Sequence, residues 1–289
     1  MILGALEAGG TKMVCAVGDE KGNILDCVSI PTEKPSKTLE RIGDYFADKN
    51  IEALGIGCFG PLDLNMDSPT YGFITSTPKP FWGNVDVVGY FKKRLLIPIG
   101  FDTDVNASCI GESVYGSSKG LSDIIYITIG TGIGIGVISN GNLLHGAMHP
   151  EGGHIFINRD ARDGFMGVCP YHKNCFEGLS SGIAVGKRFD VAAKDMSDDD
   201  PFWDIEANYI AQALINYTMV LSPQRIILGG GVMHNVSLLD KVKAEFVLLN
   251  NGYILNSFVN DIDNYIILQS LEDKQGILGA LALAHRALL

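Results

Sequence analysis

The chain alternates short, wholly apolar runs with longer stretches in which apolar residues recur at helical spacing. The short runs are bounded by glycine, proline or acidic turns, which is typical of buried β-strands. In the longer stretches, residues such as Leu39, Ile42 and Phe46 fall three or four positions apart and would share one face of a helix. In the first part of the chain this pattern predicts strands at 2–7, 13–17, 24–30, 53–59 and 99–103, and helices from 35 to about 50, at 86–96 and at 104–115.

The plan of residues 2–30 returns at residues 122–145. Each copy has an apolar strand, a glycine turn that contains one threonine, a second strand, a polar turn and a third strand. A further strand at 226–228 follows a long amphipathic stretch at 202–221, which predicts a helix that ends before Pro223. Because a plan that occurs twice indicates a duplicated architecture, the sequence predicts an α/β protein with two similar domains.

Glycine clusters follow three of the predicted strands. Glycine lets backbone N–H groups approach a phosphate with no Cβ in the way, and the neighbouring threonine and lysine side chains add hydroxyls and a charge. The first cluster matches neither the P-loop nor the Rossmann fingerprint, since both of those open a helix. Together the clusters predict a nucleotide held between the two domains, and a duplication without nucleotide is the alternative. The clusters are Gly9-Gly10-Thr11-Lys12, Gly130-Thr131-Gly132 and Gly229-Gly230-Gly231.

Two other strand ends are candidate ligand positions. Gly60 and Pro61 follow the strand at 53–59, and Asp104 follows the strand at 99–103. Open α/β sheets bind ligands at the carboxyl ends of their strands. Asp104 is either a cap of the next helix or a general base, and its position in the sequence favours neither. Residues 65–80 lack periodicity and form either a surface loop or a lid over substrate.

Four soft metal ligands gather within residues 151–177. Two thiolates and two imidazoles fit one tetrahedral Zn²⁺, which would stabilise a polar segment that has no core of its own. The alternative is two buried cysteines and two unrelated histidines. A closed metal loop would also bring Glu151 and Glu177 to one place, where carboxylates can accept hydrogen bonds from sugar hydroxyls. The candidate ligands are His154, Cys169, His172 and Cys175.

Composition narrows the class of protein. The 289 residues are enough for one large domain or two. With 22 basic and 33 acidic residues, the net charge of −11 argues against nucleic-acid and anionic-membrane partners. Neither a signal peptide nor a spanning helix is recognisable, so we expect a soluble cytoplasmic protein. The remaining cysteines lie in apolar runs and are interpreted as small core residues rather than a disulfide framework: Cys15, Cys27, Cys58 and Cys109.

In their order along nearly the whole chain, these motifs resemble those of the ROK sugar kinases, and most closely the bacterial fructokinase branch of that family. Two details are as in that branch: Glu7 stands where most of the family has Asp, and Cys169-Pro170-Tyr171-His172 replaces the commoner Cys-x-Cys-Gly. Thr103 departs from the family, which often has Asn there. One hexose contact, and with it the sugar preference, therefore stays open.

The resemblance implies the actin-like, ribonuclease H-like ATPase fold, with two lobes and a cleft between them. We expect an N-terminal lobe of residues 1–117, to which a helix at about 275–289 returns. The C-terminal lobe would comprise residues 118–274 and contain the zinc loop 151–177. We also expect a homodimer.

For the site, the resemblance implies an ATP-dependent hexose kinase in which Asp104 accepts the proton of the C6 hydroxyl of fructose. Zinc would be structural, while Mg²⁺ would accompany ATP and reach Glu7 through water. Sugar-binding residues would be Gly60, Pro61, Thr103, Asp104, Glu151, His154 and Glu177. Nucleotide-binding residues would be Gly9, Gly10, Thr11, Lys12, Gly130, Thr131, Gly132, Lys187, Gly229, Gly230 and Gly231.

Two alternatives stay open. Within the family, the sugar could be glucose, mannose or an N-acylhexosamine rather than fructose. In another class of protein, the same residues would serve a sugar sensor without catalysis, and the presence of Asp104 argues against this second alternative.

Overall fold

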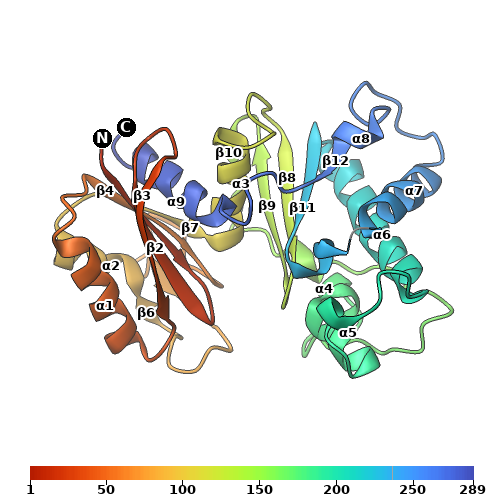
Figure 1. Ribbon diagram of the computed structural model, residues 1–289, viewed down its shortest axis with the longest axis horizontal. Coiled ribbons are helices and arrows are strands. Elements are labelled where there is room, and N and C mark those ends of the chain that lie inside the picture. The colour runs from red at the N-terminus through yellow and green to blue at the C-terminus, as the bar shows by residue number, and fades with distance from the viewer. Residues whose placement is uncertain (236) are drawn as a thin grey trace. The chain divides into compact units, whose positions relative to one another are not determined.

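The computed structural model describes residues 1–235 and 237–289, which divide into two compact units (Figure 1). Unit 1 comprises Met1–Gly120, Leu143–Pro150 and Ser270–Leu289, and unit 2 comprises Leu121–Asn142 and Glu151–Gln269. Residues 143–150 leave the second unit and rejoin the first, and we call them the returning segment. The expected C-terminal lobe of residues 118–274 includes them, whereas the structure groups them with unit 1, together with residues 118–120 and 270–274.

Each unit is built on a mixed sheet, and the two sheets have the same strand order. The orders are β3-β2-β1-β4-β7 and β10-β9-β8-β11-β12. In both, an antiparallel hairpin (β1 with β2, β8 with β9) adjoins parallel pairs. The duplication predicted from residues 2–30 and 122–145 is confirmed by this pairing. The strands are β1 (Leu3–Ala8), β2 (Lys12–Gly18), β3 (Ile24–Pro31), β4 (Ala53–Cys58), β7 (Ile99–Thr103), β8 (Ile124–Ile129), β9 (Ile133–Ser139), β10 (Asn142–Leu143), β11 (Arg225–Gly229) and β12 (Ile266–Leu268), with β5 (Phe73–Ile74) and β6 (Val85–Asp86) paired apart from them.

In unit 1 helices cover both faces of the sheet. Helices α1 (Pro35–Ala47) and α2 (Val87–Leu95) pack on one face, and α9 (Gln275–Arg286) packs on the other beside α3 (Asp104–Val114) (Figure 1). Glycine allows α9 to approach this closely. A Cβ at Gly55 would lie 1.8 Å from the carbonyl oxygen of Ala280, and one at Gly279 would lie 1.7 Å from that of Ala107. The helix backbone therefore touches strand and helix backbone directly, which any larger residue would prevent.

In unit 2 the long helix predicted at 202–221 is confirmed as α6 (Phe202–Leu221), which packs against α7 (Leu238–Asn250). The backbone of residues 155–168, all described, has no helix or regular strand, as the glycine-interrupted sequence predicts. The other helical elements are α4 (Phe176–Ser180), α5 (Gly182–Phe189), α8 (Ile262–Tyr265) and the 3₁₀ turns Gly152–His154, Ala193–Asp195 and Gly231–His234.

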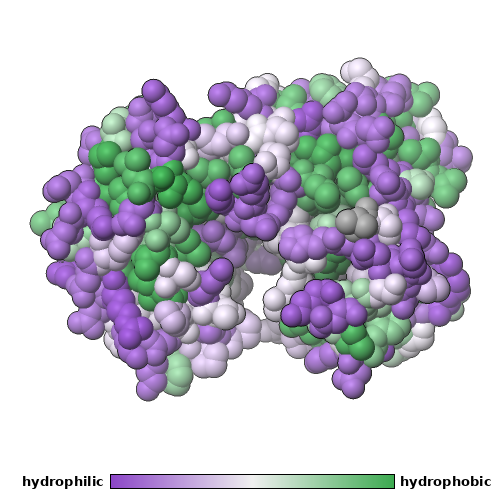
Figure 2. All heavy atoms as spheres, viewed as in Figure 1, coloured by the Kyte–Doolittle hydropathy of each residue, from purple (hydrophilic) through white to green (hydrophobic). Residues whose placement is uncertain are grey.

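The face drawn in Figure 2 is largely hydrophilic and carries separate apolar patches. The edge strand β3 contributes exposed apolar side chains, among them Leu25 at 62% exposure. Cys27 on the same strand is exposed, so its interpretation as a core residue is wrong, because an apolar run does not reveal that one face of an edge strand is uncovered. The other three are buried as predicted: Cys15, Cys58 and Cys109. None of the helices in the described part of the chain has the length and apolar character that a membrane crossing needs.

Candidate active site

Asp104 is the first residue of α3 and directly follows β7. The N-cap of this helix is Thr103, whose buried side chain accepts a hydrogen bond from the backbone N–H of Asn106 at 3.1 Å. Thr103 is therefore the cap of α3, and the Asp104 carboxylate accepts the backbone N–H of the next residue, Val105, at 2.8 Å. Gly57 lets this turn lie against β4, because a Cβ there would come within 2.6 Å of the Ala107 methyl group.

A polar network that the sequence analysis missed supports this turn. One carboxylate oxygen of Asp102 accepts a hydrogen bond from the side-chain amide of Asn106 at 2.7 Å, and the other lies 2.9 Å from Nε2 of His145. His149 Nε2 accepts a hydrogen bond from the backbone N–H of Leu62 at 3.1 Å. Both histidines belong to the returning segment, so they fasten it to unit 1. The sequence did not indicate these contacts, because His145 and His149 lie in a loop without helical or strand periodicity.

The ion pair between His145 and buried Asp102 predicts a pH-dependent stability. The hydrogen bond to Asp102 raises the pKa of His145 above its usual 6.5, while partial burial opposes the rise. Because the pKa of His145 is higher in the folded than in the unfolded state, its protonation stabilises the folded protein. This stabilisation is complete below about pH 6.5 and is lost as pH rises through the folded-state pKa. His145→Gln should therefore lower the melting temperature at acidic pH and have a smaller effect at alkaline pH.

Differential scanning calorimetry of wild type and His145→Gln, from acidic to alkaline pH, measures the melting temperatures that check the prediction. His285→Gln removes an imidazole from α9 of the same unit and is the control. An equal loss of melting temperature in His145→Gln at every pH would show that the contribution comes from packing rather than from charge.

Glu7 on β1 lies close to Asp104. Burial and the charge of Asp104 raise the pKa of Glu7 to about 7, against the opposing charge of Lys12. Gly276, at the start of α9, leaves room for this carboxyl group, since a Cβ there would lie 2.6 Å from its carbon. Like charges at one place favour a bound cation. The pair of carboxylates therefore fits a hard ion such as Mg²⁺.

The first glycine turn is hydrogen-bonded through Gly9, while Gly10 and Thr11 face solvent. The Gly9 N–H donates to the carbonyl of Lys12 at 3.1 Å, and the Thr32 hydroxyl donates to the carbonyl of Gly9 at 2.8 Å. Gly10 and Thr11 are exposed, and a Cβ at Gly10 would meet no atom within 4 Å. The turn therefore has a fixed shape and a free face.

The turn that follows β4 lies beside this hairpin. The Phe59 N–H donates to the carbonyl of Ala8 at 2.9 Å, so Gly60 and Pro61 begin next to the end of β1. The peptide bond between Gly60 and Pro61 is cis. Within unit 1, the structure thus gathers Gly60, Pro61 and the first glycine turn at one edge of the sheet.

In unit 2 the other two glycine turns meet at the carboxyl ends of β8 and β11. The N–H of Gly182, which begins α5, donates to the carbonyl of Gly130 at 2.7 Å. Gly230 has φ 88° and packs on β8, where a Cβ would lie 2.5 Å from the carbonyl oxygen of Ile129. The Ala184 N–H donates to the hydroxyl of Ser181, the N-cap of α5, at 3.2 Å. The start of α5 therefore lies at the glycine turns and is bonded to one of them. Lys187 lies in the last turn of the same helix and is exposed.

The four candidate metal ligands are brought together in unit 2. Their ligand atoms all lie within 4.8 Å of one another. Nδ1 of His154 is 3.7 Å from Sγ of Cys169 and 3.6 Å from Sγ of Cys175, and Nδ1 of His172 is 3.7 Å from Sγ of Cys169. Tetrahedral zinc, with Zn–S of about 2.3 Å and Zn–N of about 2.0 Å, requires S···N separations of about 3.5 Å. The donor set therefore fits Zn²⁺ in chemistry and in spacing.

The acidic residues around this cluster have different environments. Glu177, in the first turn of α4, accepts a hydrogen bond from the backbone N–H of Ile133 at 2.9 Å, and its other oxygen lies 3.9 Å from Nε2 of His154. Gly132 leaves space for it, since a Cβ there would lie 2.7 Å from the carboxylate. Glu151 is exposed and accepts the His154 N–H through its backbone carbonyl at 3.0 Å. The metal cluster, Glu177 and the second glycine turn are thus adjoining features of one unit.

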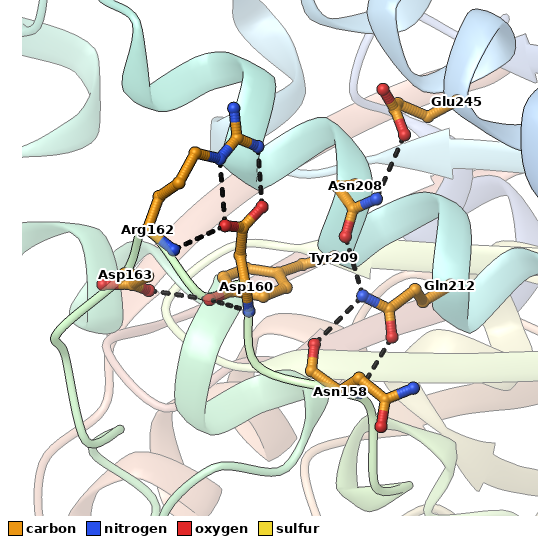
Figure 3. A network of polar contacts seen from close by, with 8 residues as sticks. All are labelled: Asn158, Asp160, Arg162, Asp163, Asn208, Tyr209, Gln212 and Glu245. Carbon is orange, nitrogen blue, oxygen red and sulfur yellow. Dashed lines mark hydrogen bonds and ion pairs between the residues drawn. The ribbon is translucent and has the colours of Figure 1, made fainter.

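Helix α6 anchors the segment that leads to the cysteines (Figure 3). Tyr209 donates its hydroxyl to Asp163 at 2.8 Å and accepts the backbone N–H of Asp160 at 3.2 Å. Gln212 accepts the Asn158 N–H at 2.8 Å and donates to the carbonyl of Asn158 at 3.0 Å. This end of the loop is therefore held by hydrogen bonds and by the ion pair between Asp163 and Arg188, and a metal would be needed only for the part that carries the cysteines.

Comparison with solved structures identifies the fold. A ROK hexokinase from Thermus thermophilus superposes with a TM-score of 0.83 at 24% identity, covering 100% of this chain and 99% of that one. A ROK family glucokinase from Streptomyces griseus, solved with glucose and AMPPNP, superposes with a TM-score of 0.75 at 24% identity, covering 99% and 100%. The fold is therefore that of the actin-like ATPases, as the repeated strand order also indicates.

The chain belongs to the ROK family, whose model matches residues 3–287. A fructokinase of Pediococcus pentosaceus is 47% identical over 288 residues, covering 100% of this chain and 99% of that protein. The resemblance stated from the motifs is confirmed at the level of the family.

Proposed function

We propose that this protein is an ATP-dependent fructokinase, which transfers the γ-phosphoryl group of ATP to the C6 hydroxyl of D-fructose. The observation that carries the proposal is the 47% identity to a fructokinase over the full length of both chains. Phosphorylation of glucose, mannose or an N-acylhexosamine is the alternative for the sugar.

Asp104 is the proposed base. As the C6 oxygen attacks phosphorus, the Asp104 carboxylate accepts the hydroxyl proton, and the bond from phosphorus to the β,γ-bridging oxygen breaks to release ADP. Support comes from its position at the end of β7 and from the capping of α3 by Thr103 rather than by Asp104. The Thr103 hydroxyl accepts the Asn106 N–H and the side chain is buried, so we assign Thr103 a positioning role rather than a strong sugar contact.

The glycine turns are the proposed phosphate sites. Backbone N–H groups and the Thr11 and Thr131 hydroxyls would donate to phosphate oxygens, and the Gly229–Gly231 turn would lie against the adenosine. Glu7 would hold a Mg²⁺ ion through water, and this ion supplies charge neutralisation to the phosphates when bound. The paired carboxylates of Glu7 and Asp104 support this assignment.

The zinc is proposed to be structural. All four ligands come from the protein, so no coordination position is left for substrate or an activated water. The ligand Nδ1 of His154 leaves its Nε2 beside Glu177, where a sugar hydroxyl could be held by both groups. Burial raises the pKa of the Cys175 thiol to about 11, so a metal would displace its proton on binding.

An assay of ADP release with fructose, mannose, glucose and N-acetylhexosamines tests the proposal. Fructose should give the highest kcat/KM. A preference for another hexose would correct the substrate. Sugar binding without ADP release from any of these sugars would instead favour the sugar sensor.

The two threonine turns make a separate prediction. Thr11→Val and Thr131→Val keep side-chain volume but remove a hydroxyl, so each should raise the KM for ATP roughly two- to ten-fold, the range of one neutral hydrogen bond. The KM for sugar should change less.

Steady-state kinetics at saturating sugar measure this effect. Thr70→Val, which removes a surface hydroxyl that donates to Asp63, is the control and should behave as wild type. An unchanged KM for ATP in both hairpin variants would remove the turns from the nucleotide site.

A further inference from the structure

The loop of residues 75–84 is firmly seated beside the first glycine turn. The Thr75 N–H and hydroxyl both donate to the carbonyl of Pro61, at 2.8 and 3.0 Å, and the Asn84 N–H donates to the carbonyl of Thr75 at 3.2 Å. Trp82 is fully buried, and its indole N–H donates to the carbonyl of Glu33 at 2.9 Å. The loop is therefore closed on itself and fixed at both ends, so its backbone has a defined course beside the turn.

Lys79 extends from this loop to the glycine turn. Its backbone N–H donates to the Thr77 hydroxyl at 3.3 Å, and its carbonyl accepts the Trp82 N–H at 3.2 Å. Its ammonium group donates to the carbonyl of Gly10, a residue 69 positions away in the sequence. Because Gly10 is exposed and has open space at its Cβ position, this places a cation at the free face of the turn.

The contact with Gly10 uses part of the donor capacity of this cation. An ammonium group has three N–H donors, and one of them meets the Gly10 carbonyl. The other two can turn toward an anion at the same turn. The carboxyl groups of Glu7 and Asp104 lie near the same turn and add no positive charge, so the ammonium group of Lys79 is a cation that a triphosphate could meet there.

We propose that Lys79 is a further catalytic residue, which donates hydrogen bonds to the γ-phosphoryl oxygens of ATP. This inference rests on the proposed function. Lys79 keeps its proton throughout the reaction: the C6 oxygen forms the new bond to phosphorus, the bond to the β,γ-bridging oxygen breaks, and the hydroxyl proton goes to Asp104. The ammonium group stabilises the charge on the equatorial oxygens during transfer and holds the phosphoryl group in line.

A merely structural role for Lys79 has a different consequence. If the side chain only ties residues 75–84 to the glycine turn, its loss should loosen the turn and weaken every nucleotide that the turn binds. If it contacts the γ-phosphoryl group, its loss should weaken ATP analogues and spare ADP, which lacks that group. The ratio of the two affinities therefore separates the roles.

The experiment measures AMPPNP and ADP binding, with Mg²⁺, to wild type and to Lys79→Met by calorimetry, together with kcat for fructose phosphorylation. Lys79→Met should lose roughly ten- to a hundred-fold in AMPPNP affinity and at least as much in kcat, the range of a charge-assisted hydrogen bond, while ADP affinity stays within about two-fold. Lys79→Arg should recover part of both. Lys34→Met is the matched control, because it removes an exposed cation that lies over Phe81 of the same loop.

Two results would overturn the inference. One is an unchanged AMPPNP affinity and kcat in Lys79→Met. The other is an equal loss of AMPPNP and ADP affinity with a lower melting temperature, which would assign the residue to structure. An inactive wild type would contradict the proposed function instead, and the AMPPNP to ADP ratio would still decide the role of Lys79.

Discussion

Asp104→Asn should reduce kcat by roughly a hundred-fold or more while fructose and ATP still bind. The amide keeps the size of the side chain and can accept a hydrogen bond, but it cannot take up the proton of the C6 hydroxyl. Because Thr103 caps α3, the fold should tolerate the change. Single-turnover kinetics, with sugar binding measured separately by calorimetry, would show a loss confined to the chemical step.

The matched control is Asp86→Asn. Asp86 caps α2 by accepting the Gly89 N–H at 2.6 Å, so its substitution tests the cost of altering an acidic residue at a helix start. It should lower stability slightly and leave kcat unchanged. If Asp104→Asn behaved in the same way, Asp104 would be part of the helix terminus and not the base.

Cys175→Ala should abolish zinc binding and sugar affinity together. Three ligands remain, and the buried position of the sulfur is left with a methyl group, so the metal is lost and residues 164–175 should become disordered. Residues 158–163 should stay in place, because α6 holds them by hydrogen bonds. Metal analysis, melting temperature and limited proteolysis would show about one zinc per chain in wild type, and cleavage of the variant after residue 163.

Cys15→Ala provides the control for this variant. Its thiol is also fully buried, but it lies in the core of unit 1, so stability should fall without loss of zinc. AMPPNP should still bind to Cys175→Ala at the glycine turns. A fully active protein free of zinc would contradict the assignment and return the four residues to the reading of unrelated cysteines and histidines.

The parts of the fold that the sequence predicted are those with a local signal. The helix at Phe202–Leu221 and the strand at Ile99–Thr103 have the expected bounds, since apolar periodicity and the flanking prolines fix them within the segment itself. The metal cluster was also visible, because Cys169, His172 and Cys175 are close in sequence. In each case the residues that carry the signal belong to one short segment of the sequence.

The features that were missed depend on contacts between distant residues. His145 is 43 residues from Asp102, and Lys79 is 69 from Gly10, so no local pattern connects them. From the sequence, residues 65–80 could be a surface loop or a lid. Only the structure shows that the chain just after them is anchored by the buried side chain of Trp82. Exposure of Cys27 is likewise decided by the place of β3 at the edge of the sheet.

The close seating of α9 has a consequence for the order in which the chain can fold during synthesis. The ribosome produces Gln275–Arg286 after every residue of unit 2, yet Gly55 and Gly279 show that unit 1 is shaped around this helix. While unit 2 emerges, one face of the sheet of unit 1 has α3 but not yet α9, so the apolar residues that α9 covers, such as Leu3 and Ala5, are exposed. Domains usually mature from the N-terminus onward. Here unit 2 can fold first, and unit 1, which carries the proposed base Asp104, can complete its fold only after α9 has been synthesised.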